Sequence, residues 1–184
     1  TLAQDNPDRA IAALTKAIER DAAAIELNLT LGALFRKRGE IDRALRLHEG
    51  VLAQPELKPD TRALALYELG QDCVKAGLLD RAEVSLKKAA QHPAFEVLSY
   101  ELLLPIYEQV GNWQQAREVA ERLESLKGQS YAAVKAHYLL ELAEQSRLAG
   151  DTAQAMKLAR RASEADARCV RASLFLGQLH EAGE

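Results

Sequence analysis

Few side chains in this sequence have the type and spacing that metal binding or nucleophilic catalysis requires. Cys73 and Cys169 are far apart and form no CxxC pair, so they predict neither a zinc site nor a disulfide framework. Ser85 and Lys88 match the S-x-x-K spacing of lysine-activated serines, but no companion motif accompanies them. P-loop, G-x-S-x-G and HExxH motifs do not occur in the sequence. We therefore predict that this chain is not an enzyme.

The composition indicates helices and a surface without a strong charge preference. Charged residues make up 28% of the 184 residues, but the net charge is only −3. Nucleic-acid binders usually carry a basic stripe, so no nucleic-acid partner is predicted. Residues that favour helices dominate, and no apolar run is long enough to span a membrane. Because the chain begins without Met and stops just after Gly183, we expect both ends to be cuts inside a longer protein.

One phrase, a turn residue followed five positions later by alanine, recurs along the whole chain. It runs from Gly39 to Ala44, Gly77 to Ala82, Gly111 to Ala116 and Gly150 to Ala155, with an opening copy from Asp5 to Ala10. The five alanines are separated by 34, 38, 34 and 39 residues. Because 34 residues is the tetratricopeptide period, the sequence predicts an all-α, right-handed superhelical solenoid of antiparallel helix pairs.

A second phrase, Leu-Gly-x-x-aromatic, precedes each turn. The main copies are Leu31 to Phe35, Leu69 to Cys73 and Leu103 to Tyr107, and weaker copies cover 142–146 and 176–180. A small residue in the first helix and the recurring alanine in the second are expected to let the two backbones approach closely. The turn glycine is expected to supply the positive φ that ends the first helix.

These phrases predict one domain made of consecutive repeats. We expect a partial repeat at 1–22, full repeats at about 24–57, 59–93, 95–128 and 131–167, and a final helix at 169–184. The first helices fall near 25–38, 60–76, 95–110, 131–149 and 169–182, and the second helices near 8–20, 41–53, 79–91, 113–127 and 152–165. Pro105 lies inside a predicted helix, which it should bend.

Several notable side chains are interpreted as packing residues. His48 occupies a large buried position of a second helix, where a hydrogen-bonded core histidine is favoured over a ligand. Cys73 stands in the aromatic position and favours a small packing residue over a reactive thiol. Trp113 favours packing over a turn, with an interface anchor as the alternative. For Asp42-Arg43 and Asp80-Arg81, first-turn capping is favoured over a charged ridge that binds a partner.

The first helix of each pair is expected to line a concave groove that binds a protein or peptide. The candidate partner-facing residues are Arg36, Lys37, Arg38, Tyr67, Gln71, Lys75, Asp80, Glu101, Glu108, Glu144 and Arg147. The groove would be basic early and more acidic later, which would orient an extended or helical ligand. Leu29 and Ala33 stand where a carboxylate clamp for chaperones needs Lys and Asn, so such a clamp is not predicted.

The stretch from Leu29 to His48 closely resembles the lipopolysaccharide assembly protein B family, chiefly through its Phe-Arg-x-Arg-Gly-Glu-x-Asp-Arg-Ala run. This run is fairly specific, whereas the other matches are moderate. The resemblance covers essentially the whole chain and continues through 69–83, 106–107, 113–114, 119–123 and 136–138.

The resemblance implies more than the residues show. That family is anchored in the bacterial inner membrane by an N-terminal helix, holds its repeats in the cytoplasm and carries a C-terminal rubredoxin-like module that binds metal. It restrains lipopolysaccharide synthesis by delivering the committing deacetylase of lipid A synthesis to a membrane-bound AAA protease. This sequence contains neither anchor nor metal module, so we expect no metal, no cofactor and no membrane contact of its own, at the cytoplasmic face of the inner membrane.

By the same resemblance, Arg36, Arg38, Gln71 and Asp80 are the strongest candidates for contacts with a partner. Two other hypotheses stay open at this point: a structural scaffold for assembly of a cell-envelope machine, and a regulatory arm of an enzyme. Homodimerisation is also left open.

Overall fold

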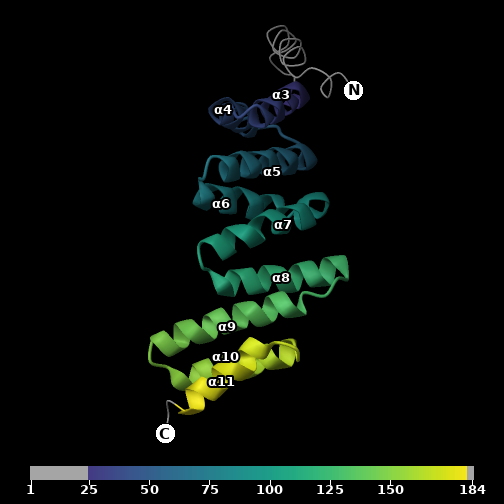
Figure 1. Cartoon of the computed structure of the whole chain (residues 1–184). Coiled ribbons are helices and arrows are strands. Elements are labelled where there is room, and N and C mark those ends of the chain that lie inside the picture. Colours follow the sequence, from purple (N-terminus) through teal and green to yellow (C-terminus); the bar gives the residue numbers. More distant parts are fainter. Residues whose placement is uncertain (1–24, 182–184) are drawn as a thin grey trace. The chain divides into compact units, whose positions relative to one another are not determined.

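The computed structural model describes residues 25–181, in which every regular element is a helix (Figure 1). In chain order these are α3 (Ile25–Lys37), α4 (Ile41–Leu52), α5 (Pro59–Lys75), α6 (Leu79–Ala89), α7 (Pro93–Gln109), α8 (Trp113–Lys127), α9 (Ala132–Leu148), α10 (Thr152–Ala165) and α11 (Val170–Glu181). The predicted all-helical class is confirmed. The helix predicted near 8–20 lies outside the described residues.

The predicted boundaries of these nine helices agree with the observed ones to within two residues at every end. By its internal contacts the chain divides into two compact units, residues 1–102 (unit 1) and 103–184 (unit 2). Each unit is described by itself below, and the single domain expected from the sequence stays a prediction. None of the helices within 25–181 has the length and hydropathy needed to cross a membrane.

The turns inside the four helix pairs share one backbone conformation. Their glycines have φ between 67° and 82°, at Gly39, Gly77, Gly111 and Gly150. In each turn the N–H of the residue after glycine donates to a carbonyl five residues earlier, at 2.9 Å, on Phe35, Cys73, Tyr107 and Ser146. This is the long hydrogen bond of the Schellman motif. The predicted helix-ending role of glycine is confirmed, and the turn forms whether or not the acceptor residue is aromatic.

Two glycines let the paired helices of unit 1 approach closely. A Cβ atom on Gly32 of α3 would lie 2.4 Å from Nε2 of His48 in α4, and one on Gly70 of α5 would lie 2.6 Å from Leu86 in α6. Real Cβ atoms do not approach other atoms so closely, so each glycine is required by the side chain that lies against it. The recurring alanines Ala44 and Ala82 are fully buried in the same pairs.

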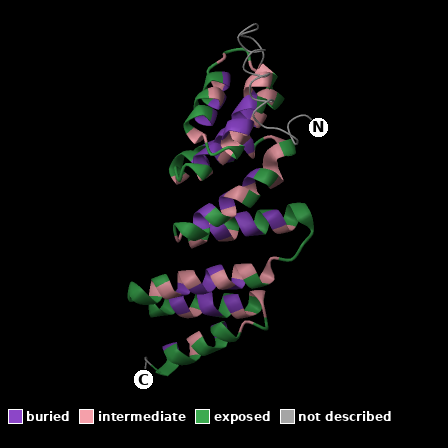
Figure 2. Cartoon of the chain, turned by 45° about the horizontal axis from the view of Figure 1, so that its top comes forward, coloured by how far each residue is buried: buried purple, intermediate pink, exposed green. Residues whose placement is uncertain are grey.

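Unit 2 achieves a similar approach with alanine. The α9–α10 core contains Leu139, Leu140 and Leu158 together with small fully buried residues, namely Ala136, Ala143, Ala159 and Ala162. Buried residues recur along the helices of the chain while other positions on the same helices stay exposed (Figure 2). The amphipathic repeat therefore places each core between helices, as the sequence periodicity requires.

The role of the glycine positions can be tested with a matched pair of variants. Gly70→Ala should lower the free energy of unfolding by about 1–3 kcal/mol, because Leu86 must move to make room. Gly50→Ala, at an exposed position of α4 with open space around it, should instead raise it by about 0.5–1 kcal/mol through helix propensity. Urea unfolding followed by circular dichroism measures both changes. Equal effects of the two variants would contradict the packing argument.

Candidate functional site

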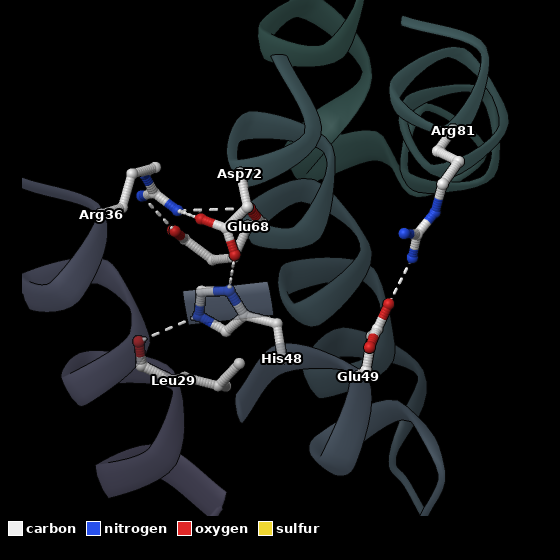
Figure 3. Close-up of polar contacts among 7 residues, drawn as sticks. All are labelled: Leu29, Arg36, His48, Glu49, Glu68, Asp72 and Arg81. Atoms are coloured by element: carbon white, nitrogen blue, oxygen red, sulfur yellow. Dashed lines mark hydrogen bonds and ion pairs between the residues drawn. The ribbon is translucent and has the colours of Figure 1, made fainter. Parts of the chain in front are cut away.

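A cluster of four charged or ionisable side chains joins α3, α4 and α5 within unit 1 (Figure 3). From α3, Arg36 donates through Nη1 to Oδ1 of Asp72 at 2.7 Å and through Nη2 to Oε2 of Glu68 at 2.5 Å. From α4, Nδ1 of His48 lies 2.5 Å from Oδ2 of Asp72, and Nε2 lies 3.2 Å from the Leu29 carbonyl oxygen. We call Arg36, His48, Glu68 and Asp72 the charged quartet.

The quartet lies in the interior. The His48 and Asp72 side chains are fully buried, and those of Arg36 and Glu68 are 11% and 17% exposed. Glu68 and Asp72 are four residues apart in α5 and so share a helix face. Burying an unpaired charge costs several kcal/mol, so these groups can be buried only because they satisfy one another.

The surroundings fix which groups in and near the cluster carry charge. Burial works against the charge of the Arg36 guanidinium, but its hydrogen bonds to Asp72 and Glu68 outweigh this and raise its pKa. Burial is also the main reason that the pKa values of Tyr67 and Cys73 are raised, so both stay neutral at physiological pH. The Arg36 guanidinium is therefore charged beside the two acids, whereas the nearby phenol and thiol are neutral.

Three interpretations of single residues are confirmed. His48 is a hydrogen-bonded core residue, and Cys73 is a fully buried packing residue with a neutral thiol. Trp113 packs in unit 2, where its ring stacks on Tyr138 with centroids 6.0 Å apart and meets His137 edge-on at 5.7 Å.

The first-turn arginines are paired, as the favoured interpretation allowed, but α4 and α6 have no side-chain capping hydrogen bond at their N-caps. Capping by Asp42 and Asp80, which lie in the first turns, stays a prediction. Arg81 of α6 donates to Glu49 of α4 (Figure 3). Arg43 pairs with Glu40 at 2.7 Å and lies over the Phe35 ring, 5.2 Å from its centroid.

The structure separates the predicted groove residues of unit 1 into two kinds. Arg36 is committed to the quartet, and Tyr67 is partly buried with its ring 5.5 Å from that of Phe95. Gln71 is partly exposed, whereas the exposed residues are Lys37, Arg38, Lys75, Asp80 and Glu101. Of these, Asp80 lies on α6, a second helix, and Arg38 pairs with Glu40. Contact of any of them with a partner stays a prediction.

The predicted groove residues of unit 2 are engaged within the chain. Glu108 accepts a hydrogen bond from the Tyr138 hydroxyl; burial, followed by this bond, raises the pKa of Tyr138. Glu144 and Arg147 pair with each other through two hydrogen bonds of 2.5 and 2.8 Å, and the bonds lower the pKa of Glu144. Their role in binding also stays a prediction.

Glu68 and Asp72 were not among the residues predicted from the sequence. A signal was present, because these two acids, four residues apart, flank Gly70 in one first helix, and the preceding first helix carries Arg36 in its last turn. Within residues 25–181, no three His, Cys, Asp or Glu side chains are grouped so that they could hold a metal ion.

The paired helices, the left-handed glycine turns and the small residues between α3 and α4, α5 and α6, and α9 and α10 define a tetratricopeptide-repeat protein. Solved structures with this fold superpose on the chain. MamA gives a TM-score of 0.61 at 21% identity, over 92% of this chain and 94% of that one. TTC0263, a tetratricopeptide-repeat protein of Thermus thermophilus, gives 0.55 at 16% identity, over 97% and 92%. These identities support the fold alone.

Sequence comparison points to a particular protein. The chain is 35% identical over 178 residues to lipopolysaccharide assembly protein B of Escherichia coli K12, and this match covers 97% of the chain. The same protein of Haemophilus influenzae is 34% identical over 154 residues, or 84% of the chain. The resemblance stated from the residues is therefore confirmed. The chain spans 46% and 39% of the lengths of these two relatives, and no family model matches it.

The structural importance of the quartet can be tested at its centre. Asp72→Asn should lower the free energy of unfolding by about 3–5 kcal/mol, because it removes the carboxylate that both Arg36 and His48 contact. Asp80→Asn, at an exposed position, is the control and should change it by less than about 0.5 kcal/mol. Chemical denaturation of both variants provides the comparison. A loss at Asp72 no larger than that at Asp80 would show that the quartet does not hold the helices together.

Proposed function

We propose that this chain is a protein-binding adaptor in the control of lipopolysaccharide synthesis. The observation that carries the proposal is the 35% identity to lipopolysaccharide assembly protein B over nearly the whole chain, in a fold that binds proteins or peptides through its extended surface. The name of this relative describes assembly rather than a reaction.

The finer proposal names the partners. The chain binds the deacetylase that commits lipid A precursors to synthesis and presents it to a membrane-bound AAA protease at the cytoplasmic face of the inner membrane. These partners follow from the family resemblance. The structure identifies exposed residues whose substitution tests such an interaction.

Within unit 1, Lys37 and Lys75 are exposed cations at the ends of two first helices and are suited to contact a partner. Each lies five residues after the glycine of its own repeat, Gly32 or Gly70, so the two lysines occupy equivalent positions at the ends of α3 and α5. Gln71, four residues before Lys75, is partly exposed on α5. Arg36 is less suitable, because the quartet already holds its guanidinium. We therefore expect an acidic segment of the partner to contact the two lysines.

The test is calorimetric titration of this chain with the purified deacetylase from the same bacterium. The proposal expects saturable binding, weakened about tenfold in the double variant Lys37→Glu, Lys75→Glu, since two exposed charge contacts are reversed. Lys88→Glu, on the exposed side of α6, changes the net charge in the same direction and should bind almost as the parent does. If the double variant binds like the parent, the two lysines are not part of the binding site. The absence of binding at high micromolar concentration would contradict the adaptor role for this part of the protein.

A further inference from the structure

Both ring nitrogens of His48 face groups that accept hydrogen bonds. Nε2 points at the Leu29 carbonyl oxygen at 3.2 Å, and a carbonyl can only accept. Nδ1 points at Oδ2 of Asp72 at 2.5 Å. A neutral imidazole has a single N–H, so it could donate to only one of these two groups. Both hydrogen bonds form with an ionised Asp72 only when the ring carries a proton on each nitrogen.

The alternative places the extra proton on Asp72, which would then donate to Nδ1. Arg36 opposes this arrangement, because its guanidinium donates to Oδ1 of the same carboxyl at 2.7 Å. A positive charge at that distance favours the carboxylate over the carboxylic acid. The geometry therefore favours an imidazolium between a carboxylate and a carbonyl oxygen.

The charge count leads to the same assignment. Arg36 of α3 and a protonated His48 supply two positive charges, and Glu68 and Asp72 of α5 supply two negative ones. The nearby Tyr67 and Cys73 of α5 are neutral, since burial raises their pKa values. On α4 itself, the adjacent Glu49 is exposed and paired with Arg81 of α6. With a neutral His48, the described residues would leave one uncompensated negative charge in a largely buried cluster, which is costly.

Close packing gives the ring little freedom to find other partners. The ring lies against the α3 backbone at Gly32, where even a Cβ atom would come within 2.4 Å of Nε2. The carbonyl of Leu29 on one side and the carboxylate of Asp72 on the other are therefore the groups that the ring must satisfy.

We propose that His48 is held as an imidazolium in folded unit 1. Its second proton completes a charge-balanced hydrogen-bond network that links α3, α4 and α5. This inference does not depend on the identity of any binding partner.

Nuclear magnetic resonance of the histidine rings tests the assignment directly. In the ¹⁵N-labelled full chain at pH 7.5, both ring nitrogens of His48 should resonate as protonated nitrogens, identified by their loss in His48→Gln. The exposed ring of His180 provides the comparison in the same spectrum. A neutral-ring signature for His48 at this pH would overturn the proposal.

Discussion

The close approach of the two helices in each repeat is the constraint from which the structure of unit 1 follows. Gly32 and Gly70 remove a Cβ atom from the first helix, and a side chain of the second helix occupies the space. In one repeat that side chain is Leu86, which needs no polar partner. In the other it is His48, whose ring brings two polar atoms into a dry interior and must have hydrogen-bond partners there. The quartet satisfies this requirement, and it extends the contact to the next helix pair through α5.

Much of this fold could be predicted from the sequence because its determinants are local and repeated. The 34-residue spacing, the turn glycines and the helix-forming composition placed both ends of each of these nine helices to within two residues. The confirmed positive φ at Gly39, Gly77, Gly111 and Gly150 has the same origin, since each glycine follows one helix and precedes another. A repeated sequence pattern therefore predicts backbone conformation well.

The same phrases say little about which side chain a long residue will contact. Periodicity placed Arg36 on the face expected to line a groove, but it could not show that the guanidinium turns to Glu68 and Asp72 on the next first helix. These acids are 32 and 36 residues away in sequence. Trp113 likewise stacks on Tyr138, which is distant from it in sequence. Contacts of this kind depend on rotamers and on the spacing between repeats, neither of which a helical pattern determines.

The quartet also divides the charged residues of unit 1 by role. Its members hold three helices together, whereas Lys37 and Lys75 remain exposed on two of those helices and are suited to contact a partner. A tetratricopeptide fold alone does not determine function, so the adaptor role depends on the similarity to lipopolysaccharide assembly protein B. The structure shows which charged side chains of unit 1 are exposed and which are already held in the quartet.

The central claim is that Arg36 and Asp72 act together as parts of one buried network. A double-mutant cycle tests this most directly, with Arg36→Met, Asp72→Asn and the combined variant unfolded in urea in the full chain. We predict a coupling free energy of about 1–3 kcal/mol between the two sites, because they share one network. Additive effects to within about 0.5 kcal/mol would show that the two residues stabilise the fold independently and would contradict this account.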